Sequence, residues 1–439
     1  QLLSNKRPGE TQVPPHDETR SRFEQDFDRI VFSHPFRKLQ DKTQVFPLPE
    51  DDFVHTRLTH SLEVSSVGRS LGKSAGAYII QKYPELSSHG YTVHDIGAIV
   101  GAACLAHDLG NPPFGHSGED SISSFFLTNE KGLFFKDKVS KEEWKDLTTF
   151  EGNAQGLRIL NGKGSGGLKL TYATLGAFTK YPLSSSCEKE KRRKSQKKFG
   201  YYQCNAKLFQ EMATQMGLVS LSDYKWCRHP LAFLVEAADD ICYHIIDLED
   251  GCRLGLVPFE TVKKLLAAII GKNYSEEKVQ KIASLNERLG TLRALAIGKL
   301  IEECADVFIE NEEAMLNGSF DKDLTRLIPS AAALNQIIDL SVKEIYQSKP
   351  VLEKEAGGFE VIDHLTEAFT TAMYTKYFGQ PLPKHISTLK LIPEEYTVQL
   401  DDAQDVYEAL QIVIDFISGL TDSHAVRLYK TIKGYRLLV

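Results

Sequence analysis

The chain has 439 residues, of which 42% are hydrophobic and 25% are charged, and its formal net charge is −7. This composition is typical of a globular protein in aqueous solution, and the length allows one large domain or two to three smaller ones. The negative charge excludes a global basic field for nucleic acid, so a bound polyanion would need a local cluster of cations or a metal.

The cysteines and the apolar runs bear on where the protein resides. Seven cysteines form no C-x-x-C pair, and no signal peptide is apparent, which favours a reducing cytoplasm. The longest apolar run extends from Ile96 to Ala106 and is too short to span a bilayer. We therefore expect a cytoplasmic protein with no membrane partner.

Apolar residues recur at helical spacing along most of the chain, which predicts a mainly α fold. The first 22 residues are polar and contain prolines, so they are predicted to form an extended arm. Strand-like alternation is confined to residues 42–49. The segments with helical patterns are residues 21–39, 57–83, 92–110, 229–251, 258–271, 275–316, 331–347 and 405–420.

A stretch near residues 184–200 has an unusual composition. It follows a Gly/Ser-rich segment and is strongly basic at residues 191–194 and 197–198. Such a composition favours a solvated, mobile insertion. The alternative interpretation is a patch for phosphate or single-stranded nucleic acid, to which Phe199, Tyr201 and Tyr202 would contribute stacking surfaces.

The stretch AHDLGNPPFGHSGED, residues 106–120, places His107 and Asp108 where an apolar helix meets a Gly/Pro breaker. Adjacent imidazole and carboxylate groups there suit a divalent metal, although a surface pair joined by a hydrogen bond would have the same sequence. Two further residues, His60 and Asp239, strengthen the metal interpretation. Asp239 lies on an apolar helix, where a carboxylate is costly to desolvate unless it is paired or binds a cation.

The order of these residues and the text around them resemble the deoxyguanosinetriphosphate triphosphohydrolase family of HD-domain metal-dependent phosphohydrolases. The resemblance runs from about Phe23 to about Val257 and resumes near the C-terminus. The blocks that carry it are DFDRIVFSHPFRKLQDKTQVFPL, HTRLTHSLEV, AHDLGNPPFGHSGE, FEGNAQGLRIL, LTYATLGAFTKYP, EAADDICYHIIDLEDG and FISGLTDSHAVRLYKTIKG.

The resemblance implies an HD-domain helical bundle with additional C-terminal helices. We expect an arm over residues 1–22, a catalytic core over 23–257 and a helical region over 258–439 that packs on the core. It also implies one divalent metal per active site, with Mn or Mg as the natural choice for mixed nitrogen and oxygen ligands. The residues that match the family's metal ligands are His60, His107, Asp108 and Asp239.

Two residues of the same stretch match the family's catalytic pair. His116 is expected to transfer a proton or act in line at the α-phosphorus, with Glu119 orienting its imidazole. The two can share a face if a helix begins near Gly115. Asn111 stands where some relatives carry a histidine, which puts a second catalytic histidine in doubt.

The resemblance further implies substrate contacts. Arg57 matches a phosphate-binding arginine, and Gln44 matches a residue that bonds the sugar 3′-hydroxyl. Val45 matches the neighbour that would exclude a 2′-hydroxyl. Tyr243 and Asp247 match an aromatic residue under the sugar and a second acceptor for the 3′-hydroxyl.

Four further positions have less specific matches. Lys180 and Tyr181 are candidate triphosphate contacts. Asn153 and Gln155 lie either beside the pocket or in purely structural positions.

The expected reaction is hydrolysis of dGTP to deoxyguanosine and inorganic triphosphate. The alternatives are a broad-specificity dNTP triphosphohydrolase, another HD nucleotide phosphohydrolase, and a non-catalytic nucleic-acid-binding regulator. The family also implies a homo-oligomer, with a hexamer as one form, and an effector site for single-stranded DNA or a nucleotide.

Overall fold

The computed structural model describes residues 1–12, 20–46, 55–162, 167–190 and 193–435. Helices dominate these ranges, and the described strands form one small hairpin, β1 Ser220–Ser222 and β2 Lys225–Trp226, paired antiparallel. The prediction of a mainly α fold is therefore confirmed. Within the described ranges, no helix has the length and apolar character required to cross a membrane.

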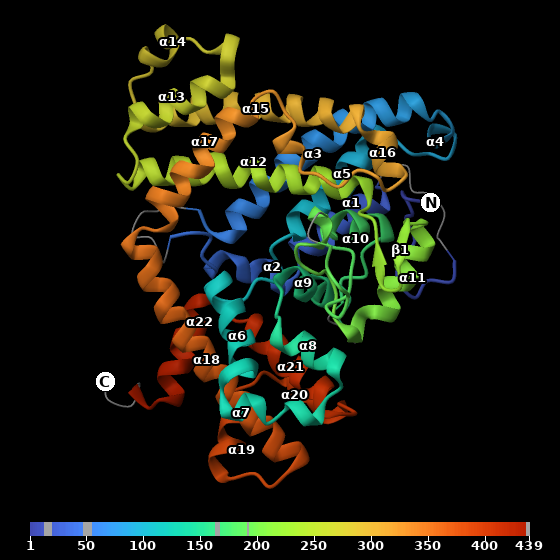
Figure 1. The fold of residues 1–439 in the computed structure, drawn as a ribbon, viewed down its shortest axis with the longest axis vertical. Coiled ribbons are helices and arrows are strands. Elements are labelled where there is room, and N and C mark those ends of the chain that lie inside the picture. The colour runs from blue at the N-terminus through green and yellow to red at the C-terminus, as the bar shows by residue number, and fades with distance from the viewer. Residues whose placement is uncertain (13–19, 47–54, 163–166, 191–192, 436–439) are drawn as a thin grey trace.

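The molecule is elongated, and its helices form an upper and a lower group joined by shorter elements (Figure 1). The upper group contains α3 Arg57–Lys82, α4 Glu85–Ser88, α5 Val93–Ala106, α12 Pro230–Arg253, α13 Phe259–Ile270, α14 Glu276–Gln280, α15 Leu285–Glu310, α16 Glu312–Leu316 and α17 Ala331–Ser341. The elements between the groups include α1 Arg22–Val31, α2 His34–Lys38, α9 Gly152–Leu160, α10 Tyr172–Phe178 and α11 Ala206–Met216.

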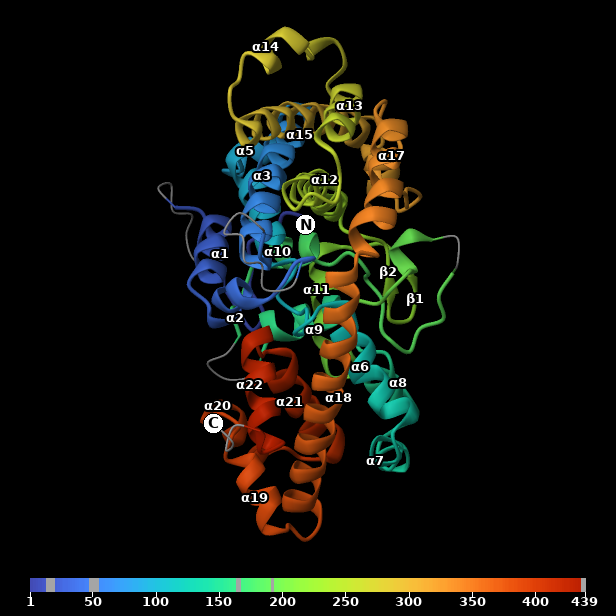
Figure 2. The ribbon, with the colours of Figure 1, turned by 90° about the vertical axis from the view of Figure 1, so that its left-hand side faces the viewer.

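The lower group is built around a long helix that descends alongside two others (Figure 2). This helix, α18, packs against α6, α21 and α22. The members of the group are α6 His116–Thr128, α7 Glu130–Leu133, α8 Lys141–Thr148, α18 Lys349–Phe378, α19 Pro383–Leu389, α20 Glu394–Asp402, α21 Val406–Ser418 and α22 Asp422–Ile432.

Each group has its own apolar core. The upper core is centred on α3, α5 and α12, and a continuous cluster joins Val64 and Ile99 to Leu292 of α15. The lower core includes Phe125 of α6 and Phe369 of α18. One apolar core thus includes residues on both sides of position 257, while the domain boundary that we placed there stays a prediction.

Close packing of α3 on α5 depends on small residues. Gly68, Gly72 and Gly76 recur every four residues, so they share one face of α3. A Cβ atom at Gly72 would lie 3.0 Å from the Cα atom of Gly97 on α5. The two helices that carry His60 and His107 are therefore held close together by backbone-to-backbone packing.

Several local expectations differ from the structure. The segment 275–316 is divided into α14, α15 and α16, and the 30-residue helix α18 was not predicted at all. The expected strand is reduced to an isolated bridge between Thr43 and Thr56, and its residues 47–49 lie outside the described ranges. The arm is anchored on the core, because the buried Arg7 guanidinium pairs with Asp26 at 2.5 Å.

The turn after α5 approaches the start of α9 more closely than any side chain would allow. A Cβ atom at Gly110 would lie 2.0 Å from the carbonyl oxygen of Gly152 and 2.2 Å from the nitrogen of Gly156. Both neighbours are backbone atoms, so a larger residue requires the turn or the helix to move. The glycine thus fixes where α9 meets the turn that follows His107 and Asp108.

We expect Gly110→Ala to lower the free energy of unfolding by about 1–3 kcal/mol, because overpacking forces backbone shifts. The matched control is Gly298→Ala on an exposed face of α15, where an added Cβ meets nothing within 4 Å. Alanine there should raise stability by about 0.5–1 kcal/mol. Chemical denaturation measures the free energy of unfolding of both variants. Equal changes in the two variants would contradict the close approach at Gly110.

Candidate functional site

The candidate site lies where α3, α5 and α12 of the upper group meet the first turns of α6 and α9. α5 begins with a capping box between Thr92 and Asp95 and continues through a buried apolar stretch to Ala106. The Gly-Asn-Pro-Pro sequence then ends the helix. Its last residues and the start of the turn therefore deliver His107 and Asp108 to the junction.

Three of the four expected metal ligands form a compact group. His60, His107 and Asp108 each offer a ligand atom, and these atoms lie within 4.8 Å of one another. The fourth, Asp239, is adjacent, with its Oδ1 atom 3.3 Å from His60 Nε2 and 3.4 Å from His107 Nε2. The helices thus gather two imidazoles and two carboxylates, while their role as metal ligands stays a prediction.

The hydrogen bonding of His107 suits metal ligation. Its Nδ1 atom lies 2.7 Å from the carbonyl oxygen of Cys104, which is an acceptor only. In the neutral ring that a metal would require, this contact favours a proton on Nδ1 and turns the lone pair of Nε2 toward Asp108 and Asp239. Two neutral imidazoles and two carboxylates form a donor set that fits a divalent cation such as Mn²⁺ or Mg²⁺.

Both carboxylates of this group are paired with a buried cation. Arg57 Nη1 lies 2.8 Å from Asp108 Oδ2, and Lys180 Nζ contacts Asp239 Oδ2. Burial alone would raise the pKa of Asp108, but Arg57 and His107 outweigh it and lower that pKa to about 2. In the same way, Lys180 and His107 hold the pKa of Asp239 well below its usual range, against the opposing effect of burial.

A second cluster of charges begins at α6, which starts at His116 as the spacing required. Glu119 is buried and accepts from the backbone nitrogen of Gly152 at 2.8 Å. Lys198 Nζ lies 3.8 Å from Glu119 Oε2 and 3.1 Å from Glu151 Oε1. Burial and the neighbouring Glu151 raise the pKa of Glu119 to about 7.

His116 lies at the exposed edge of this cluster. Partial desolvation, together with Lys198 and Arg57, lowers the pKa of His116 below its ordinary value. Among the described residues, no hydrogen bond joins His116 to Glu119. The orienting role of Glu119 therefore stays a prediction.

The loop with Gln44 and Val45 is brought beside Arg57. Thr43 pairs with Thr56 across an isolated bridge, and Arg57 N donates to the carbonyl of Lys42 at 3.0 Å. Two polar atoms in this region, Gln44 Oε1 and Arg57 Nε, are buried and have no hydrogen-bond partner among the described residues. Both are available to a ligand that donates to the amide and accepts from the guanidinium.

Tyr243 and Asp247 form a wall on α12, one turn apart. The ring of Tyr243 stacks on Tyr346 with centroids 5.6 Å apart, and Tyr346 Oη donates to Asp247 Oδ2 at 2.8 Å. Burial raises the pKa of Asp247 well above its usual range. Tyr346 belongs to a π-helical turn, Val342–Tyr346, that follows α17.

Other expected contacts lie elsewhere or have other partners. Tyr181 is buried in a small apolar cluster with Leu183 and Phe199. Gln155 donates to Asp415 at 2.8 Å, which is a structural contact between α9 and α21. The amide of Asn111 donates to Asp108 Oδ1, and the amide of Asn153 donates to Glu151 at 2.7 Å.

The basic stretch is largely packed where the structure describes it. Phe199, Tyr201 and Tyr202 are all buried, so their rings are not available to stack on nucleic-acid bases. Lys194 pairs with Asp323 at 2.6 Å. Residues 191–192 of the stretch lie outside the described ranges.

Sequence reasoning missed Lys198, Glu151 and Tyr346 as site residues. Glu151 lies in the block FEGN that carried the resemblance, so its position was a usable signal. Lys198 is one of several cations in the basic stretch, and Tyr346 lies in a segment that was predicted only to be a helix. Nothing in the local sequence of Lys198 or Tyr346 distinguishes these two residues from surface residues.

The chain is similar to known proteins along its whole length. Residues 328–431 match the phosphohydrolase-associated domain family. Over its whole length the chain is 41% identical to a deoxyguanosinetriphosphate triphosphohydrolase-like protein of Synechocystis, covering 99% of that protein. A protein of the same name from Pseudomonas aeruginosa is 39% identical over 99% of this chain and 98% of its own length. The deoxyguanosinetriphosphate triphosphohydrolase of Yersinia pseudotuberculosis is 29% identical over 93% of each chain.

A helical scaffold that gathers two histidines and two aspartates, followed by a phosphohydrolase-associated domain, defines an HD-type phosphohydrolase. Such enzymes use a divalent metal, and the donor set described above fits one. More specifically, the chain belongs to the deoxyguanosinetriphosphate triphosphohydrolase-like family.

We expect the double variant His107→Ala with Asp108→Ala to lose high-affinity binding of one Mn²⁺ per chain, because half of the donor set is removed. Isothermal titration calorimetry measures the stoichiometry. His94→Ala, which removes an exposed histidine from the same helix α5, is the matched control and should bind as the wild type does. Unchanged Mn²⁺ binding by the double variant would contradict the ligand assignment.

Proposed function

We propose that the chain is a metal-dependent triphosphohydrolase that cleaves dGTP to deoxyguanosine and inorganic triphosphate. The observation that carries the proposal is the compact His60, His107 and Asp108 group with Arg57 beside it. The residues that we propose as metal ligands and the cation that we propose to bind phosphate thereby lie close together. When bound, Mn²⁺ or Mg²⁺ would polarise a phosphoryl oxygen and lower the pKa of a bound water.

The chain's own cations supply the rest of the phosphate site. Arg57, Lys180 and Lys198 are each within reach of the carboxylates around the metal group or of Glu119. The planar guanidinium of Arg57 suits a bidentate contact with phosphate, and its Nε atom has no partner in the described structure. In our proposal, these residues hold the triphosphate while His116 exchanges a proton at the α-phosphate.

The sugar contacts support a deoxynucleotide. Gln44 Oε1 is buried, has no partner within the described ranges and would accept from the 3′-hydroxyl, as would Asp247 if its hydrogen bond from Tyr346 were shared. Val45 packs against the upper core and would leave no room for a 2′-hydroxyl. The ring of Tyr243 offers the sugar an apolar face.

The names of the relatives support guanine as the base, but only in part. The Yersinia protein is called a deoxyguanosinetriphosphate triphosphohydrolase, whereas the more similar relatives are called triphosphohydrolase-like. The second candidate function is therefore a triphosphohydrolase that accepts all four dNTPs. Self-association and activation by single-stranded DNA or a nucleotide stay predictions of the family resemblance.

The decisive experiment is a hydrolysis panel of the four dNTPs and GTP with Mn²⁺ or Mg²⁺, repeated with single-stranded DNA. We expect inorganic triphosphate as the phosphate product and hydrolysis of GTP at least about tenfold slower than that of dGTP, because a pocket that excludes one hydroxyl costs the poorer substrate at least about 1.4 kcal/mol. Anion-exchange chromatography identifies the products. Release of pyrophosphate or orthophosphate from a dNTP would contradict the reaction, and equal hydrolysis of all four dNTPs would favour the second candidate.

The pH profile tests Glu119. Its pKa of about 7 means that the carboxyl is protonated below pH 7 and ionised above it, whereas His116, with a lowered pKa, stays neutral in this range. If the carboxylate supports catalysis, kcat/KM rises with pH through about 7 and levels off above it. Glu119→Gln should abolish this rise, and Asp120→Asn, at the exposed next position, should retain it. If kcat/KM of Glu119→Gln still rose with pH around the same pKa, that pKa would belong to another group.

A further inference from the structure

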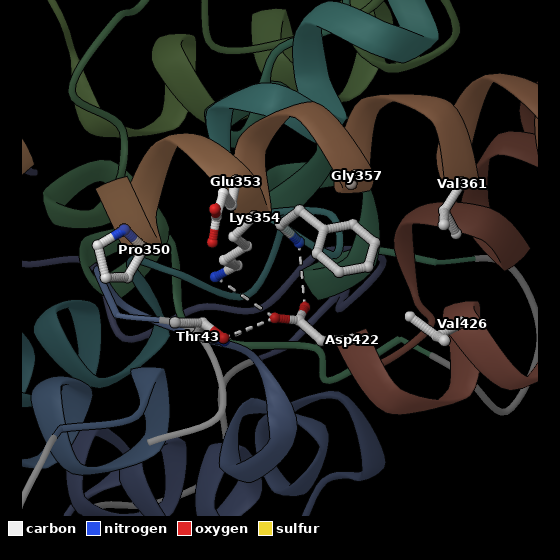
Figure 3. Close-up of a pocket in the computed structure, with 10 residues that line it drawn as sticks. Thr43, Pro350, Glu353, Lys354, Gly357, Val361, Asp422 and Val426 are labelled. Atoms are coloured by element: carbon white, nitrogen blue, oxygen red, sulfur yellow. Dashed lines mark hydrogen bonds and ion pairs between the residues drawn. The ribbon is translucent and has the colours of Figure 1, made fainter. Parts of the chain in front are cut away.

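Asp422, the first residue of α22, is buried, and its carboxylate serves two loops that are remote in sequence. One oxygen, Oδ2, accepts from Thr43 N at 3.2 Å and from Thr43 Oγ1 at 2.7 Å. The other, Oδ1, accepts from Phe114 N at 3.0 Å. Lys354 Nζ of α18 lies 3.6 Å from Oδ2 and completes the cluster (Figure 3).

These two loops carry residues of the proposed site. Thr43 directly precedes Gln44, and Phe114 lies two positions before His116. Phe114 has a φ angle of 64°, a conformation that costs a bulky residue free energy and persists only where its surroundings hold it. The hydrogen bond from its nitrogen to Asp422 is one contact that holds it.

The carboxylate is not needed to cap its own helix. Thr421 is the N-cap residue of α22, and its side chain already accepts from the nitrogen of His424. Burying a carboxylate costs free energy of desolvation unless hydrogen bonds offset it. The hydrogen bonds from Thr43 and Phe114 offset that cost, and they explain a carboxylate at this position.

A second buried side chain joins the same parts. Lys42, next to Thr43, donates from Nζ to the carbonyl of Asn111 at 2.6 Å and to the carbonyl of Ser418 at 2.7 Å. Ser418 is the last residue of α21, and Asn111 opens the turn that leads to His116. Two independent contacts thus fasten the phosphohydrolase-associated domain to both loops.

We propose that Asp422 is a positioning residue of the phosphohydrolase site, which fixes the Gln44 loop and the turn before His116 at one point. The active site is then incomplete without the phosphohydrolase-associated domain. The inference rests on the proposed function, because the positions it fixes are those of the proposed sugar-binding and proton-transfer residues.

The first test compares Asp422→Asn with the wild type. An asparagine oxygen can accept from one loop, but its amide nitrogen cannot accept from the other. We expect kcat for dGTP to fall about 10- to 100-fold, because displacement of a catalytic group by about 1 Å has this effect. Mn²⁺ binding should be unchanged, since no metal ligand is altered. The control is Ser423→Ala, which removes a 2.9 Å hydrogen bond from α22 to Asp41 and should keep kcat within about twofold of the wild type.

The second test separates the two loops. Thr43→Val removes the hydroxyl contact but keeps the backbone N–H, so we expect KM to rise several-fold while kcat is nearly retained. In combination with Asp422→Asn the effects should be less than additive, since both variants weaken the contact between Thr43 and residue 422. If Asp422→Asn fails to fold, Thr43→Val still tests the contact between Thr43 and Asp422.

Amide hydrogen exchange provides a readout that does not depend on activity. We expect the amides of Thr43 and Phe114 to exchange faster in Asp422→Asn, with exchange in α15 unchanged. If the wild type hydrolyses no dNTP, the proposed function fails, and the exchange rates alone decide whether Asp422 holds the two loops. Unchanged exchange at both amides, or a kcat within twofold of the wild type in Asp422→Asn, would overturn the proposal.

Discussion

The ionic pairing of Asp239 is the interaction on which the site depends. This aspartate lies half-buried in the middle of α12, whose buried residues are mostly apolar, and an unpaired carboxylate there would be costly to keep ionised. Its partners are Lys180, His60 and His107, which come from three different parts of the chain. Satisfying this one charge therefore brings α3, the end of α5 and the segment after α10 together on α12. The metal-ligand group is the place where they converge.

The convergence is made possible by features that bear no charge. The glycine face of α3 allows α5 to approach closely, and Gly110 allows α9 to reach the turn after Asp108. None of these glycines contributes chemistry, but they permit distances between backbones that a side chain would prevent. The lower group adds the remaining constraint, because Ser418 and Asp422 reach across to the loops of the upper group. The site is thus shared between two apolar cores and is rigid because both are packed.

The sequence predicted those parts of the fold and site that have a local pattern. Periodicity predicted long helices such as α3, α5 and α12. The family's blocks indicated the proposed ligand residues, which are His60, His107, Asp108 and Asp239. The 30-residue α18 was missed, because two adjacent glycines, Gly357 and Gly358, interrupt its pattern. Gly358 packs against Phe114, so its small size serves a tertiary contact that no local rule contains. Lys198 was missed for a similar reason: its role depends on Glu119 and Glu151, which are remote in sequence.

The balance of charge around the site has a consequence for binding. Arg57 and Lys180 already pair with Asp108 and Asp239, so in the proposed enzyme a polyphosphate that bound alone would compete with these two carboxylates for its cations. A divalent cation held by the same carboxylates must likewise compete with Arg57 and Lys180. When metal and polyphosphate bind together, the metal would pair with the two carboxylates and the polyphosphate with Arg57 and Lys180. No charge of the site would then be left unpaired. Metal and polyphosphate are therefore expected to strengthen each other's binding, and by thermodynamic linkage the enhancement is equal in both directions. A substrate without a phosphate chain would gain nothing from this exchange, which makes the pairing itself a source of specificity for polyphosphates.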